Sequence, residues 1–139
     1  MESLALGFLL ALPLVTSVLG EPRRRPNQGG DTCYSVTYDS IQPGVGVEIL
    51  PKTLRRSPGV DRGRLVTDDT IPFWTRGYTW SSWRAWGDSL EFLLSEGQVE
   101  LTIHVRVRGD TLRGRLSYRT DVGDEHWARV TAVRRSCLK

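Results

Sequence analysis

The sequence predicts an all-β domain, a single antiparallel meander that closes into a small barrel of about eight strands. Apolar and polar residues alternate with period two through most of the chain, and short turn sequences separate the alternating stretches. Neither a repeat nor a long helical pattern is found. Because closure removes the exposed edges of a meander, we expect a barrel. A β-sandwich built from the same strands is the alternative.

The first 20 of the 139 residues are apolar from Leu4 onward and are typical of a secretory signal peptide. Val18 and Gly20 are the small residues expected before a cleavage site. The run Arg23–Arg25 directly after the apolar segment favours the alternative, a retained membrane anchor. We expect cleavage, and therefore a secreted or periplasmic protein without a transmembrane span after the signal is removed.

Residues 21–31 contain proline, arginine and glycine but no apolar side chain to bury, and they predict a disordered tether. The barrel domain is expected to span residues 32–139. Arginine supplies 17 of the 19 positive charges, and the net charge is +3. This mild positive balance allows contact with an anionic surface without demanding it.

The two cysteines, Cys33 and Cys137, open and nearly close the expected domain. In an exported protein an even number indicates a disulfide, with two free thiols as the alternative. The bond would close a loop of about 105 residues and contribute on the order of 4–5 kcal/mol in the chain-entropy model. Because the first and last strands of such a barrel are neighbours, the bond would staple its seam.

Residues 99–119 give the clearest strand prediction. Apolar and polar residues alternate from Val99 to Val107, and Gly109-Asp110 forms a two-residue turn of the type II′ kind. This turn fixes the register. The inner pairs are then Val107 with Leu112, Val105 with Gly114, Ile103 with Leu116 and Leu101 with Tyr118.

Glu96-Gly97 predicts a second two-residue turn, which would place Leu94 opposite Val99 and Phe92 opposite Leu101. The inner face would then continue over three strands. Less strongly patterned strands are expected at residues 32–39, 45–50, 64–68, 78–84 and 126–136. The proline- and glycine-rich stretch 51–63 is expected to be a loop.

A short secreted meander barrel with "GDTLRG"-type turns and a tryptophan near a strand start resembles the lipocalin and avidin-like calycins. The resemblance concerns architecture and implies a small barrel. The order "CY", "SWRAWGDSLEF", "RGDTLRGR" and a C-terminal cysteine is also similar to small exported bacterial proteins of unknown function. That second resemblance implies no activity.

Six aromatic residues lie between Phe73 and Trp86. As a strand, this segment would point Tyr78 and Trp80 inward and Trp83 outward, whereas a helical turn would put Trp80 and Trp83 on one side. We expect the strand. The rings could fill the core, line a pocket for one small ligand, or form an exposed platform that stacks on sugars.

The first functional hypothesis is a secreted, non-enzymatic barrel that binds a small apolar or aromatic ligand in its mouth. An eight-stranded barrel has room for its own side chains or for one such ligand. The residues expected to line the pocket are Tyr34, Tyr38, Tyr78, Trp80 and Phe92.

The second hypothesis is an envelope interaction module that binds an anionic surface or polymer. Arg106, Arg113, Arg115 and Arg119 are predicted to share the outer side of residues 99–119, and we call this set the arginine face. Arg106 opposite Arg113 is unfavourable unless an anion or carboxylate intervenes. A solvated, salt-bridged surface is the structural alternative. Nucleic acid is not favoured, because no aromatic side chain is predicted between the arginines.

No cofactor, metal site or catalytic group is predicted. The chain contains no Gly-x-Ser-x-Gly sequence and no CxxC spacing. The acidic loop before His126 lacks the spacing of an EF-hand, and His104 is expected on the surface. The third hypothesis is a hydrolase. The predicted strands do not bring together the acid, base and nucleophile that it would need.

Overall fold

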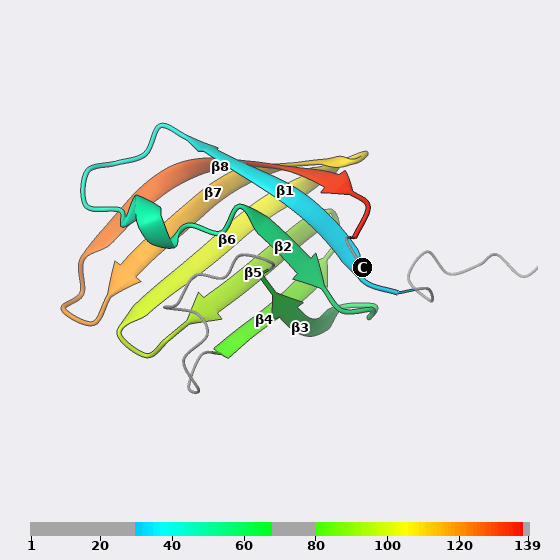
Figure 1. Ribbon diagram of the computed structural model, residues 1–139, viewed down its shortest axis with the longest axis horizontal. Helices are drawn as coiled ribbons and strands as arrows, with labels where there is room; N and C mark the ends of the chain where they lie inside the picture. The colour runs from blue at the N-terminus through cyan, green and yellow to red at the C-terminus, as the bar shows by residue number, and fades with distance from the viewer. Residues whose placement is uncertain (1–29, 68–79, 138–139) are drawn as a thin grey trace, which may run out of the picture.

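The computed structural model describes residues 30–67 and 80–137 as a closed barrel of antiparallel strands in chain order (Figure 1). The predicted signal peptide and nearly all of the tether lie outside these residues. The fold is the predicted meander barrel rather than the sandwich. The strands are β1 (Thr32–Asp39), β2 (Thr53–Arg56), β3 (Arg62–Val66), β4 (Trp80–Trp86), β5 (Ser89–Ser95), β6 (Val99–Arg108), β7 (Thr111–Thr120) and β8 (Glu125–Arg135).

The hairpin of β6 and β7 has the predicted register along its whole length. Gly109 begins the turn with φ of 62°, the left-handed conformation expected for the first central residue. Val105 lies opposite Gly114, where a β-carbon would meet the backbone of β6, including the Cα of Val105 at 2.7 Å. Glycine at this position therefore permits the two strands to approach.

The register of β5 against β6 differs from the prediction by two residues. Phe92 pairs with Ile103, because the connection is longer than the predicted two-residue turn. Within this loop the carboxylate of Glu96 accepts hydrogen bonds from the amides of Gln98 (3.3 Å) and Val99 (3.1 Å). Since a shift of two residues preserves the side-chain alternation, the predicted inner face is retained.

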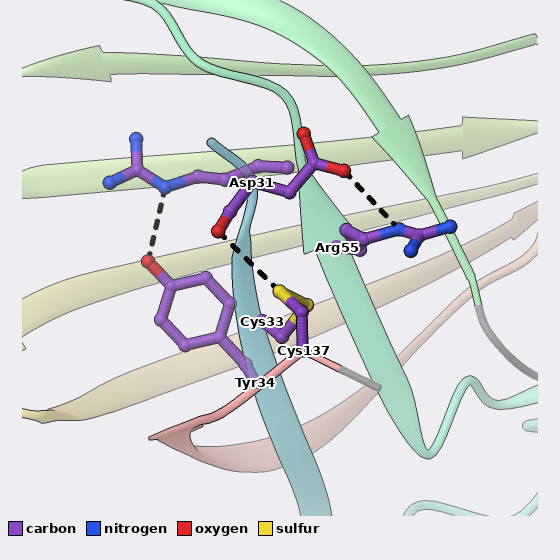
Figure 2. Close-up of a disulfide and its surroundings, with 6 residues drawn as sticks. Asp31, Cys33, Tyr34, Arg55 and Cys137 are labelled. Atoms are coloured by element: carbon purple, nitrogen blue, oxygen red, sulfur yellow. Dashed lines mark hydrogen bonds and ion pairs between the residues drawn. A yellow bond between two sulfur atoms is a disulfide. The ribbon is translucent and has the colours of Figure 1, made fainter. Parts of the chain in front are cut away.

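The seam of the barrel is closed by both backbone and covalent bonds. β1 pairs with β8, with Val36 opposite Ala132. The predicted disulfide joins Cys33 to Cys137, with the two Cα atoms 5.2 Å apart (Figure 2). Beside it, the carboxylate of Asp31 lies 3.5 Å from Nε of Arg55. The first strand is therefore tied to both of its neighbours at this end.

Two predictions for residues 45–63 are wrong. Residues 45–50 form a 3₁₀ turn, η1 (Val47–Ile49), instead of a strand, and β2 lies within the stretch expected to be a loop. Val45 and Ile49 are buried, four residues apart, as on one side of a helical turn. Figure 1 shows η1 at the opposite end of the barrel from the end of β8. The segment therefore packs onto that end instead of adding to the wall.

The predicted orientation of β4 is also wrong. Trp83 points inward and is 1% exposed, whereas Trp80 points outward and is 60% exposed. Glycines make room for the inward indole, because a β-carbon on Gly63 would lie 2.6 Å from Nε1 of Trp83. The interior is one continuous apolar cluster. Its members are Tyr34, Val36, Val45, Ile49, Leu50, Leu54, Leu65, Trp83, Leu90, Phe92, Leu94, Leu101, Ile103, Val105, Leu112, Leu116, Ala128, Val130 and Ala132.

Candidate functional site

The rings expected to line a pocket are only partly brought together. Tyr34 and Phe92 are buried and meet edge to face, with ring centroids 5.9 Å apart. Tyr38 is half-buried and donates a hydrogen bond from its hydroxyl to the carbonyl of Pro51 (2.6 Å). Trp80 lies on the outside of the barrel, and Tyr78 lies outside the described residues. The two fully buried rings are thus parts of the core.

The polar atoms of the buried rings are satisfied by neighbouring side chains. Nε of Arg56 donates to the hydroxyl of Tyr34 (3.1 Å), and the guanidinium of Arg56 lies 4.6 Å from the ring centroid of Trp83. The indole N–H of Trp83 donates to Oγ of Ser57 (3.4 Å). These contacts explain how the rings are held in place.

The arginine face is formed as predicted on the outer side of β6 and β7. Arg106 lies directly opposite Arg113. On the other edge of β7, Arg115 lies directly opposite Arg129 of β8. Two like-charged pairs therefore occur side by side on neighbouring strands. Such pairs are destabilising when nothing lies between them.

The arginines differ in their carboxylate partners. Arg119 lies 4.0 Å from Glu100, and Arg129 lies 3.6 Å from Asp39. None of the ion pairs formed within residues 30–67 and 80–137 involves Arg106, Arg113 or Arg115. Positive charge is therefore least compensated at the centre of the face.

Two surface hollows lie on the arginine face. One, of about 580 Å³, is lined by Arg106, Arg108, Thr111 and Arg113. The other, of about 520 Å³, lies over β7 and β8. Its lining is Ser40, Gln42, Arg113, Gly114, Arg115, Trp127, Ala128, Arg129, Val130 and Thr131. Arg113 borders both hollows and is the central residue of the face.

Tryptophans border this face, contrary to the expectation that it lacks aromatic side chains. The guanidinium of Arg115 lies 4.1 Å from the ring centroid of Trp127. On the opposite side, the ring of Trp86 meets that of His104 edge to face, with centroids 5.3 Å apart. The alternation of β8 already placed Trp127 outward. The sequence did not show the register between β7 and β8, and this register brings the indole of Trp127 beside Arg115.

Residues 30–67 and 80–137 contain no group of three or more His, Cys, Asp or Glu side chains placed to hold a metal ion. Within the same ranges, no helix has the length and apolar character needed to cross a membrane. The ring of His126 packs over Gly44, where a β-carbon would lie 2.6 Å from it.

No family model, curated protein or solved structure matches the chain. The fold and the arginine face therefore define the class of this protein. It is an eight-stranded antiparallel meander barrel, compatible with the architecture of the calycins, with one disulfide at the seam and an arginine-rich outer wall.

Proposed function

We propose that this protein is a binding module that holds an anionic partner on its arginine face. The single observation that supports the proposal is the pair of directly opposed arginine pairs, Arg106 with Arg113 and Arg115 with Arg129. Like charges placed directly opposite each other cost stability, and Arg106 and Arg113 have no carboxylate partner among the described residues to offset it, whereas Arg129 has Asp39. A bound oxyanion would turn this repulsion into charge-assisted hydrogen bonds, for which the planar guanidinium is well shaped.

The module is proposed to act outside the cytoplasm. A disulfide between Cys33 and Cys137 persists in oxidising compartments, which supports export through the expected signal peptide at residues 1–20. On this proposal, residues 21–31 tether the barrel domain of residues 32–139.

Binding of a small ligand inside the barrel, as the calycin resemblance suggests, stays a prediction. No hollow described above opens between Tyr34 and Phe92, whose rings contact each other within the apolar cluster. The outer wall therefore provides the better-supported function.

The test is titration of the protein with dextran sulfate and with inorganic polyphosphate at several salt concentrations. We expect binding that weakens steeply as salt rises, because ion release accompanies contact between opposite charges. Arg106→Glu combined with Arg113→Glu should abolish it. Unchanged binding by that double variant would refute the proposal.

A matched pair of single variants separates a built site from net charge. Arg113→Gln and Arg119→Gln remove one positive charge each from the same strand, but Arg119 already has Glu100 as a partner. We expect Arg113→Gln to weaken binding about tenfold, equivalent to about 1.4 kcal/mol, and Arg119→Gln to weaken it less than twofold. Equal losses would mean that net charge alone attracts the polyanion.

A further inference from the structure

A transverse row of outward-facing residues crosses four strands of the barrel wall. Trp86 on β4 lies opposite Ser89 on β5, which lies opposite Arg106, which in turn lies opposite Arg113. Since neighbouring strands are about 4.8 Å apart, the row is about 14 Å long. Ser89 has a short side chain, so the long side chains of this row are the indole and the two arginines. The ring of Trp86 also meets His104 of β6, two strands away, so the indole lies toward the arginines and one extended ligand can contact all three.

Trp86 is held in place and is still accessible. Its ring contacts the ring of His104, and the guanidinium of Arg84 lies 5.1 Å from its centroid. Nevertheless 45% of the residue is exposed. A restrained, half-exposed indole offers an apolar surface to a partner at little cost in side-chain entropy. This is a surface on which the C–H side of a sugar ring packs.

The row fits a chain of sugars better than a chain of bases. Successive bases need successive open rings on which to stack. Of the two indoles that border this face in the described part of the chain, Trp127 is the less exposed, and the guanidinium of Arg115 lies over its ring. Neutral hydroxyl side chains lie among the arginines, namely Thr111 and Thr131. They supply both hydrogen-bond donors and acceptors for sugar hydroxyl groups.

From this row we infer that the partner is a sulfated polysaccharide. On the proposed function, on which this inference rests, Arg106 and Arg113 bind a sulfate group in the hollow between β6 and β7. The planar fork of each guanidinium matches two oxygen atoms of such a group. Trp86 then packs against a sugar ring of the same chain, three strands away from Arg113.

The experiment compares four probes at one fixed salt concentration by calorimetric titration. They are a heparin hexasaccharide, the same hexasaccharide after desulfation, single-stranded DNA of matched charge, and vesicles that contain an anionic phospholipid. We expect the sulfated hexasaccharide to bind at least tenfold more tightly than each of the others. Tighter binding of the DNA or of the vesicles would overturn the inference.

The second part of the experiment titrates the Trp86→Ala variant with the hexasaccharide. Trp80→Ala, on the same strand, is its matched control. Both indoles are exposed, so neither substitution should impair folding, and circular dichroism checks this. We expect Trp86→Ala to weaken hexasaccharide binding about tenfold, because the ligand would cover this indole, and Trp80→Ala to change it less than twofold.

The outcomes distinguish the two proposals. If Arg113→Gln weakens the binding of every polyanion but Trp86→Ala changes nothing, the sulfated polysaccharide is wrong and the arginine face stands. If no polyanion binds, or if Arg106→Glu combined with Arg113→Glu leaves binding unchanged, the proposed function itself is wrong. Loss of hexasaccharide binding in both Trp86→Ala and Arg113→Gln, with Trp80→Ala unchanged, supports both.

Discussion

The two sides of the barrel are closed in different ways. The long-strand wall, β4 to β8 with β1, is a continuous ladder in which β6 and β7 pair from end to end. The short-strand wall consists of β2 and β3, where Arg55 and Arg56 are the β2 residues that pair with β3. Here the indole of Trp83, beneath Arg56 and beside Gly63, supplies packing where backbone hydrogen bonds are few. The comparison shows that a side-chain cluster packs behind the barrel wall where the backbone ladder is shortest.

The largest expected effect comes from removing the centre of that cluster. Trp83→Ala should lower the free energy of unfolding by about 3–5 kcal/mol, because it removes a fully buried ring and leaves a cavity. Urea denaturation followed by circular dichroism measures this. Trp80→Ala, which deletes an exposed indole from the same strand, should change stability by less than about 0.5 kcal/mol. A loss below about 1 kcal/mol for Trp83→Ala would mean that the few ladder bonds suffice.

Glycine-to-alanine substitutions, one in each wall, compare how easily the two walls accept an added methyl group. At Gly114 a β-carbon would meet backbone atoms of His104 and Val105, which cannot move without distorting the long-strand wall. At Gly63 it would meet the side chains of Ser57 and Trp83. We expect Gly114→Ala to cost about 2–3 kcal/mol and Gly63→Ala about 1 kcal/mol, since overpacking is relieved more easily by side chains. The reverse order in thermal melts would show that the short-strand wall is the stiffer one.

The smallest effect is expected on the outside of the long-strand wall. Nε of Arg84 lies 2.8 Å from a carboxylate oxygen of Glu91 on the neighbouring strand. A double-mutant cycle with Arg84→Gln and Glu91→Gln should give a coupling of about 0.2–1 kcal/mol, because Arg84 is largely solvated. A coupling well above this range would indicate that surface charge, and not the ladder alone, holds the wall.

The hairpin of β6 and β7 in the long-strand wall could be predicted because the residues that set its register are close together in the sequence. Gly109-Asp110 fixes the register of β6 and β7 without reference to the rest of the chain. The loop between β5 and β6 was less predictable, since the carboxylate of Glu96 caps it through two amides and thereby lengthens it. The alternation nevertheless kept every inner residue of β5 on the predicted side.

The orientation of β4 at the boundary of the two walls could not be predicted, because it depends on residues that are distant in the sequence. Aromatic rings occupy both faces of β4, so alternation alone does not decide between Trp80 and Trp83. The space left by Gly59 and Gly63, some twenty residues earlier in the chain, decides it. The candidate site was likewise predictable only where it depends on residues that are close in the sequence. Its arginines followed from one hairpin, whereas the tryptophans beside them depended on pairings with β4 and β8.

The position of the disulfide also determines how the molecule responds to tension. Cys33 stands at the beginning of β1, and Cys137 follows the end of β8. A stretching force applied to the chain on the two outer sides of these residues passes from one sulfur atom directly to the other. The β1–β8 ladder bears none of it, so the barrel can be pulled by both of its ends without being unzipped.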